Sequence, residues 1–256
     1  MQSELRQSIL RVTFSRRMLV AFVMGFSCGL PLLLTISVLQ AWMKDEGVDL
    51  TIIGMMALVG LPYTLKFLWA PFLDRFTLPL LGRRRGWMLV AQIALTISIA
   101  SLGQSDPVQN PWLLAFAAFL VTFFSASQDI VVDAYRREDL SDEELGLGSS
   151  LYISGYRLGM LLASGGGLIM ADYMDFSMVY LILAGCMLPG LMTTLLTPEP
   201  ETPAGTPKNM RAAVIDPLVE YFSRKGALWI LAFILFYKVG DTMASAMTTI
   251  RIAASD

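Results

Sequence analysis

The chain has no histidine, only two cysteines among its 256 residues, and few charges, since 16% of its residues are Asp, Glu, Lys or Arg. Without histidine, imidazole metal sites and Ser-His-Asp or Cys-His catalysis are excluded. Cys28 and Cys186 both lie in apolar runs, so we interpret them as buried side chains and not as a disulfide. The net charge of −2 gives no indication of a nucleic-acid partner. The sequence predicts no enzyme, no metal and no cofactor.

Apolar residues, in contrast, are abundant. They make up 55% of the chain, and the mean hydropathy is +0.60, whereas soluble domains are about 45–50% apolar. A membrane-spanning helix needs roughly 20 mostly apolar residues, and in lipid only internally bonded backbone is stable. Seven segments meet that length, and we predict a helix for each: 18–40, 50–73, 87–104, 111–134, 147–171, 176–196 and 227–250.

Basic residues alternate between the connections of these segments. The N-terminal tail, the second, the fourth and the sixth connections are basic, while the other three hold one lysine among them. Cytoplasmic loops carry the excess of Lys and Arg in membrane proteins. The pattern therefore predicts a multi-pass protein with a cytoplasmic N-terminus.

The sixth connection, 197–226, differs from the others because "TPEPETPAGTPKN" contains four prolines. We expect it to be extended, hydrated and not helical. The chain then divides into a cytoplasmic basic tail, a six-helix transmembrane bundle, a cytoplasmic linker, and a seventh helix with a short tail, at 1–17, 18–196, 197–226 and 227–256. This is an all-α integral membrane fold, the first half of a two-bundle transporter plus one helix. We expect a truncated product that lacks its second bundle.

Ionisable residues inside the predicted spans are the strongest candidates for function, because a charge at mid-bilayer costs about 2.5–3.5 kcal/mol. Counting 1.5 Å of rise per residue places Lys66, Asp129 and Arg157 in one layer. One interpretation is a network that neutralises itself and stabilises the bundle. In the other, Lys66 and Arg157 hold substrate carboxylates while Asp129 takes and releases a coupling proton. Asp133 lies nearer the surface, where we expect it to cap the cytoplasmic end and pair with a loop arginine.

Polar neighbours extend this candidate site. Gln128 precedes Asp129, and Tyr63 and Tyr156 lie deep in their spans beside charged positions, where they are candidates to line a pocket for a sugar or peptide. Lys238 and Asp241 place a further pair of charges in the seventh span. We count all of these among the candidate substrate-binding residues.

Small residues recur at helical spacing in the first and fifth spans. Gly25 and Gly29 precede Pro31, and Gly155 is followed by Gly159. This spacing favours close helix packing, and Pro31 is expected to bend its helix. Because interrupted helices also mark binding sites in transporters, a hinge role stays open.

The connection between the second and third spans, "LDRFTLPLLGRRRGW", resembles the loop signature of the major facilitator superfamily. The resemblance implies that its charges latch the cytoplasmic helix ends during alternating access. Asp74, Arg75, Arg83 and Arg84 are the candidate latch residues. Ordinary anchoring by basic residues is the alternative.

Six stretches in order carry a closer resemblance: "GLPLLLTISVLQAWM", "YTLKFLWAPFLDRF", "GRRRGWMLV", "SASQDIVVDAY", "GYRLGML" and "YKVGD". Together they look like the AmpG-type muropeptide permeases of Gram-negative bacteria. The resemblance implies proton-driven import of N-acetylglucosaminyl-1,6-anhydro-N-acetylmuramyl peptides across the inner membrane, for peptidoglycan recycling and β-lactamase induction. The implied partners are the muropeptide, protons, the lipid bilayer and the second bundle. The alternatives are a permease for another anionic substrate, such as an acetyl-CoA-like group, or a membrane fragment that transports nothing.

Overall fold

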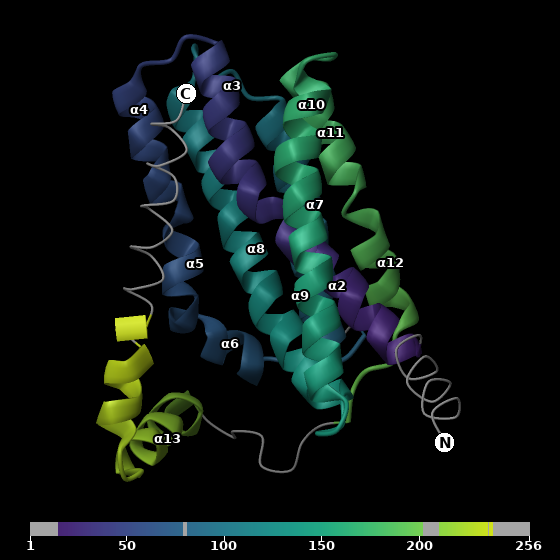
Figure 1. Ribbon diagram of the computed structural model, residues 1–256, viewed down its shortest axis with the longest axis vertical. Coiled ribbons are helices and arrows are strands. Elements are labelled where there is room, and N and C mark those ends of the chain that lie inside the picture. The colour runs from purple at the N-terminus through teal and green to yellow at the C-terminus, as the bar shows by residue number, and fades with distance from the viewer. Residues whose placement is uncertain (1–14, 79–80, 202–209, 235, 238–256) are drawn as a thin grey trace. The chain divides into compact units, whose positions relative to one another are not determined.

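The computed structural model describes residues 15–78, 81–201, 210–234 and 236–237 (Figure 1). The chain divides into two compact units, Met1–Thr206 and Pro207–Asp256. Regular structure in the described residues is helical, and their only β-type pairing is an isolated bridge between Leu78 and Gly82. The predicted all-α membrane fold is confirmed.

The first spanning segment is one helical run of 30 residues, Arg16–Asp45. It comprises α2 (Arg16–Leu33), a π-helical segment η1 (Leu34–Val38) and α3 (Leu39–Asp45). The run begins where the Ser15 hydroxyl accepts a hydrogen bond from the Met18 N–H, an N-cap. Pro31 lies in the last turn of α2, and the π-helical segment begins three residues later. The N–H that proline lacks would have bonded the Ser27 carbonyl, one turn before Pro31 and not in the π-helical segment. Within that segment the Thr35 hydroxyl donates to the Leu32 carbonyl at 3.2 Å.

The second span is a series of short pieces instead of one continuous helix. These are α4 (Leu50–Met55), η2 (Met56–Gly60), α5 (Leu61–Leu65), η3 (Lys66–Leu68) and α6 (Ala70–Arg75), of which η2 and η3 are 3₁₀ helices. Gly60, Pro62 and Pro71 lie at the joints, where glycine and proline weaken an α-helix. We refer to this series as the broken helix.

The remaining helices of the first unit follow the predicted spans closely. They are α7 (Arg83–Gly103), α8 (Pro111–Asp139), α9 (Leu145–Leu161), the π-helical η4 (Leu162–Gly166), α10 (Gly167–Ala171), α11 (Phe176–Gly185) and α12 (Leu188–Leu196). Two boundaries differ, because α7 begins at Arg83 and not at 87, and α8 continues to Asp139 and not only to 134. Arg136 and Arg137 lie in its last turn, where positive charge suits the helix dipole. Arg136 is therefore a helical residue and not a loop residue.

Five helices within the described residues are long and apolar enough to cross a membrane: Arg16–Asp45, Leu50–Leu68, Arg83–Gly103, Pro111–Asp139 and Phe176–Leu196. The predicted span 147–171 is helical from Leu145 to Ala171 but is not among the five. Its glycines, serines and Arg157 make it less apolar than the others.

The second unit contains a helix in a segment that we predicted to be non-helical. We expected 197–226 to be extended, yet α13 (Met210–Ser223) lies within it. The four prolines that suggested an extended chain all precede this helix, and the residues that follow include good helix formers such as Met, Arg and Ala. Residues 227–234 and 236–237 of the predicted seventh span are helical.

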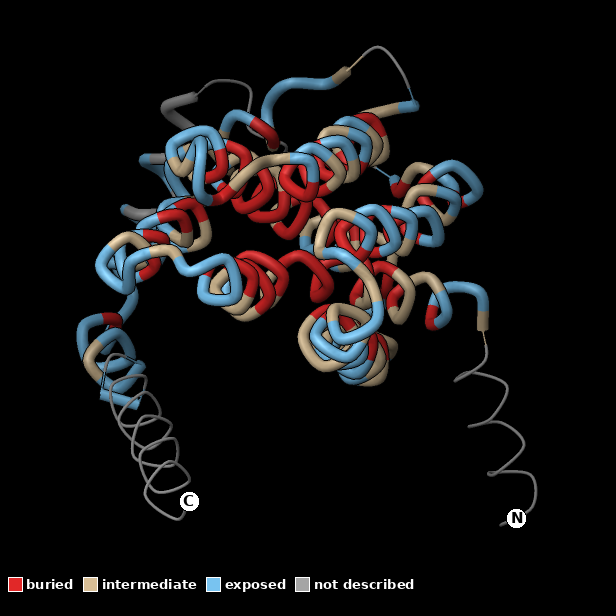
Figure 2. Tube along the Cα trace, turned by 90° about the horizontal axis from the view of Figure 1, so that it is seen from above, coloured by how far each residue is buried: buried red, intermediate tan, exposed pale blue. Residues whose placement is uncertain are grey.

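Helices α2 and α9 make the closest helix contact in the first unit. An added Cβ at Gly25 or Gly29 would collide with the backbone carbonyls of Tyr152 or Tyr156. Reciprocally, a Cβ at Gly155 or Gly159 would collide with backbone of α2. We call this contact, formed by Gly25, Gly29, Gly155 and Gly159, the glycine seam. Figure 2 shows buried positions gathered toward the middle of the bundle, where the apolar core and the buried polar groups described next are found.

Candidate functional site

The centre of the candidate site is an ion pair between the broken helix and α8. The Lys66 Nζ lies 3.7 Å from Asp129 Oδ2. The Lys66 side chain is 38% exposed, whereas that of Asp129 is only 10% exposed. Lys66 begins the 3₁₀ segment η3, and Asp129 lies ten residues before the end of the continuous helix α8. A partly accessible cation thus faces a buried, fixed carboxylate.

Several oxygen atoms near this pair along the two helices have no hydrogen-bond partner. Within the described residues, the buried atoms Tyr63 OH, Ser125 Oγ, Gln128 Oε1 and Asp129 Oδ1 make no hydrogen bond to protein. Ser125 and Asp129 are four apart on α8 and so share one face, and Tyr63 precedes Lys66 by three residues. Buried polar groups are nearly always paired in proteins. These atoms therefore have unused capacity for a proton, water or a ligand.

Gln128 connects α8 to α2. Its Nε2 donates to Ser27 Oγ at 3.0 Å and to Cys28 Sγ at 3.4 Å. Gln92 makes a similar connection on α7, where its Oε1 accepts a hydrogen bond from Thr194 Oγ1 at 2.7 Å. The amide nitrogen of Gln128 thus ties this stretch of α8 to α2, while its Oε1 is buried and makes no hydrogen bond to protein.

Arg157 does not join the Lys66–Asp129 pair. It lies exposed on α9, and no acid of the described part pairs with it. Tyr156 is half-buried, with its ring 6.1 Å from that of Tyr152. Of the three residues that depth placed in one layer, Lys66 and Asp129 are therefore in contact, and Arg157 is not. Lys238 and Asp241 lie outside the described residues.

Three of the four predicted latch residues, Asp74, Arg83 and Arg84, belong to one charge network at the ends of α6, α7 and α8. Arg84 Nη1 lies 2.5 Å from Asp74 Oδ1, and its Nη2 lies 2.6 Å from Glu138 Oε1. Arg83 Nη2 also reaches Glu138, at 2.8 Å. Arg75 pairs with no acid in the described part of the chain and lies over the Phe76 ring, 5.6 Å from its centroid. Glu138 was not among the predicted latch residues, because its partners Arg83 and Arg84 lie 55 and 54 residues away in the sequence.

Glu199, which lies in the segment after α12, contacts the same end of the bundle. Its carboxylate accepts the backbone N–H groups of Arg84 at 2.7 Å and Arg85 at 3.0 Å, so it caps the N-terminus of α7. Gly82 permits this approach, because its φ is +97° and a Cβ there would collide with the Glu199 side chain. No local motif in the sequence predicts this long-range cap.

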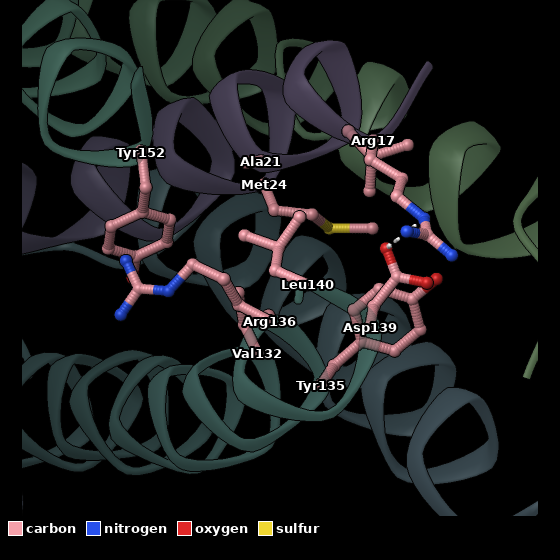
Figure 3. A pocket seen from close by; sticks show the side chains of 10 residues that line it. Arg17, Ala21, Met24, Val132, Tyr135, Arg136, Asp139, Leu140 and Tyr152 are labelled. Carbon is pink, nitrogen blue, oxygen red and sulfur yellow. Dashed lines mark ion pairs between the residues drawn. The ribbon is translucent and has the colours of Figure 1, made fainter. Parts of the chain in front are cut away.

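The ends of α2, α8 and α9 meet in the small pocket of Figure 3. Arg17 on α2 pairs with Asp139 at 4.0 Å and with Glu144 at 3.1 Å. Asp133 pairs with Arg136 at 3.0 Å, and the Arg136 guanidinium lies 4.2 Å from the Tyr152 ring centroid. The expected partner of Asp133 was a loop arginine, but Arg136 belongs to α8 itself. Ion pairs of Arg17 thus join α2 to α8 and to the start of α9, while Arg136 joins α8 to α9 through the Tyr152 ring.

The fold and these paired intramembrane charges define a multi-pass, all-helical membrane protein. The family model of the Major Facilitator Superfamily matches residues 17–253, and the chain belongs to that superfamily.

Named relatives agree with this placement. The chain is 44% identical over 242 residues to the anhydromuropeptide permease of Escherichia coli strain K12, covering 94% of this chain and 49% of that protein. It is also 44% identical over 241 residues to an uncharacterized protein of Haemophilus influenzae, covering 92% and 57% of the two chains. A putative transporter AmpG 1 of Rickettsia prowazekii is 35% identical over 181 residues, with coverage of 69% and 41%. The chain spans about half the length of the curated relatives it matches.

Proposed function

We propose that this chain forms one helical bundle of a transporter that imports anhydro-muropeptides across the bacterial inner membrane together with protons. The imported muropeptides would enter peptidoglycan recycling and feed β-lactamase induction. The observation that carries the proposal is the Lys66–Asp129 pair, in which one carboxylate oxygen has no partner. The name of the E. coli relative, 44% identical over most of this chain, supports the substrate class.

Coupling follows from competition for the lysine. Without substrate, Lys66 neutralises Asp129. A muropeptide carries peptide carboxylates, and one of them would displace Asp129 from the exposed side of Lys66. A buried carboxylate that loses its cation is strongly destabilised, so Asp129 would take up a proton as the substrate arrives. Release of the substrate would return Lys66 to Asp129 and release the proton.

The other candidate residues would contact the remainder of the substrate. Arg157 is exposed on α9 and is available to a second carboxylate. Tyr63 and Tyr156 would offer aromatic faces to sugar rings, and the buried, unpaired Oε1 of Gln128 would accept a hydroxyl hydrogen where the substrate reaches it. We include Lys238 and Asp241 of the seventh span in the same proposed set.

The basic network at the ends of α6, α7 and α8 would be the cytoplasmic latch. In this proposal the N-terminus is cytoplasmic, and Arg84 holds Asp74 and Glu138 together while the cytoplasmic side is closed. Glu199 supports the latch through its cap on α7. A second bundle, which the longer relatives have room for, would complete the binding site.

Uptake of labelled anhydro-muropeptide into cells without their own permease tests the proposal. We would express a chimera in which this chain replaces the matching half of the E. coli permease, beside the chain alone. We expect Asp129→Asn to abolish the pH dependence of uptake, and the matched Asp133→Asn to keep it. Equal pH dependence in Asp129→Asn and the parent chimera, at equal membrane insertion, would overturn the coupling role. A chimera that inserts but imports no muropeptide would overturn the substrate assignment.

A further inference from the structure

An apolar cavity of about 150 Å³ lies between α6, α7 and α8, and its lining includes neither Lys66 nor Asp129. Aromatic rings dominate its lining: Trp69, Phe72, Trp87, Phe123 and Phe124. Phe72 on α6 and Val90 on α7 are each 45% exposed, while the remaining lining residues are more buried. The cavity therefore opens between α6 and α7, and we call it the α6–α7 groove.

The walls of the α6–α7 groove offer no free polar group to a ligand. Its one hydroxyl is that of Ser127, which accepts the Trp69 indole N–H at 3.0 Å and donates to the Phe123 carbonyl at 2.8 Å. The Trp87 indole N–H is also used, because it donates to the Phe76 carbonyl at 2.5 Å. A polar occupant would lose its hydrogen bonds to water and find none here. The occupant must therefore be a hydrocarbon.

Positive charge lies at one end of the groove on both helices. Arg75 follows Phe72 by three residues on α6, and Arg83 precedes Trp87 by four residues on α7, so each arginine continues a stripe of lining residues. The Trp87–Phe76 hydrogen bond holds these two helix ends together. Within the described residues Arg75 pairs with no acid, whereas Arg83 is 11% exposed and already pairs with Glu138, so Arg75 is the group available to an anion. This end of the groove can thus accept an anion.

We propose that the α6–α7 groove binds an anionic phospholipid, with one acyl chain between Trp69 and Trp87 and the phosphate on Arg75. Such a lipid carries hydrocarbon chains and a negative phosphate in one molecule. The groove offers an apolar surface to the acyl chain, and Arg75 at its end offers a positive charge to the phosphate. Basic pockets between membrane helices bind anionic headgroups in this way. The binding is independent of the proposed muropeptide transport.

The two tryptophans of the groove provide the measurement. The purified full chain is reconstituted into phosphatidylcholine vesicles that contain a minor fraction of phosphatidylglycerol or phosphatidylcholine with brominated acyl chains. Bromine quenches tryptophan fluorescence at contact. We expect stronger quenching by brominated phosphatidylglycerol than by brominated phosphatidylcholine. Trp87→Phe should remove much of this difference, because it removes a reporter inside the groove.

Two variants separate the headgroup from the acyl chain. Arg75→Gln should lower the preference for phosphatidylglycerol about fivefold, the effect expected of one arginine at an anionic surface. Val90→Phe narrows the mouth of the groove and should reduce quenching by both brominated lipids. Arg137→Gln is the matched control, since that arginine is 64% exposed and pairs with Asp142 elsewhere. Equal quenching by the two lipids, or a preference in Arg75→Gln equal to that in Arg137→Gln, would overturn the proposal. Circular dichroism of each variant verifies that its helices are intact.

Discussion

The glycine seam and the broken helix lie in one bundle but are built on opposite principles. In the first spanning run, Arg16–Asp45, 56% of the most apolar window is buried, and the seam brings its backbone against α9. In the broken helix, only 11% of the corresponding window is buried, and 3₁₀ turns interrupt the ladder twice. Dense packing fixes a helix, whereas a poorly buried helix with weak turns can shift at small cost.

The charges of the candidate site are divided between these two kinds of structure. Asp129 lies on α8, in which 61% of the apolar window is buried, and Gln128 ties that stretch to α2. Lys66 lies on the broken helix at the start of a 3₁₀ turn. We therefore expect the carboxylate to stay in place while the cation moves. The following predictions test that division, beginning with the largest effect.

The first prediction concerns the close packing of the glycine seam. Gly29→Ala places a methyl group against the backbone carbonyl of Tyr156, which cannot move as a side chain could. We expect a loss of at least about 3 kcal/mol in the free energy of unfolding, at the upper end of what overpacking costs. The measurement is the thermal unfolding midpoint of the purified chain in detergent.

Gly54→Ala on the broken helix is the matched control. An added Cβ at Gly54 meets no atom within 4 Å. Alanine is also about 1 kcal/mol better than glycine in a helix interior, so this variant should unfold at the same temperature or slightly higher. Equal unfolding temperatures for Gly29→Ala and Gly54→Ala would remove the distinction between the two regions.

The second prediction compares two arginines of one connection. Arg84 is 7% exposed and bridges Asp74 and Glu138, while Arg75 pairs with no acid among the described residues. Arg84→Gln should lower the free energy of unfolding by about 2 kcal/mol, less than for a fully buried pair because Asp74 is 41% exposed. Arg75→Gln should change it by less than about 0.5 kcal/mol. A stability loss that is equal in both variants would show that the network contributes nothing of its own.

Sequence alone predicts much of this fold because long apolar runs have one solution in lipid. The spans, the all-helical class and the position of the basic connections follow from length and charge. The same rule predicted one continuous span over 50–73 and gave no weight to Gly60, Pro62 and Pro71, which lie at the joints of the broken helix. It also misplaced the end of α8 and missed α13, because the basic and proline-rich stretches were interpreted as loops.

The candidate site also contains one contact that the sequence predicted and others that it did not. Depth along the helices indicated that Lys66 and Asp129 share a layer, and their atoms lie 3.7 Å apart. Depth carries no information on rotation about the helix axis, which is why Arg157 was placed in a layer it does not join. Glu138 and Glu199 were missed for another reason. Their partners are 54 to 115 residues away in the chain, so no local spacing records the contact.

The third prediction tests the difference in solvent access between Lys66 and Asp129. In a background with Cys28→Ser and Cys186→Ser, Lys66→Cys and Asp129→Cys are labelled with a charged thiol reagent. Because the Lys66 side chain is 38% exposed and that of Asp129 is 10% exposed, we expect labelling at position 66 to be about tenfold faster or more. Equal rates at the two positions, in proteins of equal helicity, would contradict the division.

The smallest effect is expected where charge reinforces the end of the glycine seam. Glu144, just before α9, accepts the Ser141 backbone N–H at 3.2 Å and pairs with Arg17 of α2 at 3.1 Å. These contacts, first the backbone hydrogen bond from Ser141 and then the Ser141 hydroxyl and Arg17, hold the pKa of Glu144 below its usual 4.5.

A lowered pKa stabilises the folded chain above the pKa of the unfolded state, and the stabilisation is lost as the pH falls through the folded pKa. Glu144→Gln should therefore lower the free energy of unfolding at neutral pH by less than about 1 kcal/mol, and the difference from the parent should shrink below pH 4.5. Glu143→Gln, one residue earlier and exposed, is the control. A difference for Glu144→Gln that stays constant between neutral and acidic pH would mean that packing, and not charge, joins α2 to α9 at this end, so that the seam would depend on its glycines alone.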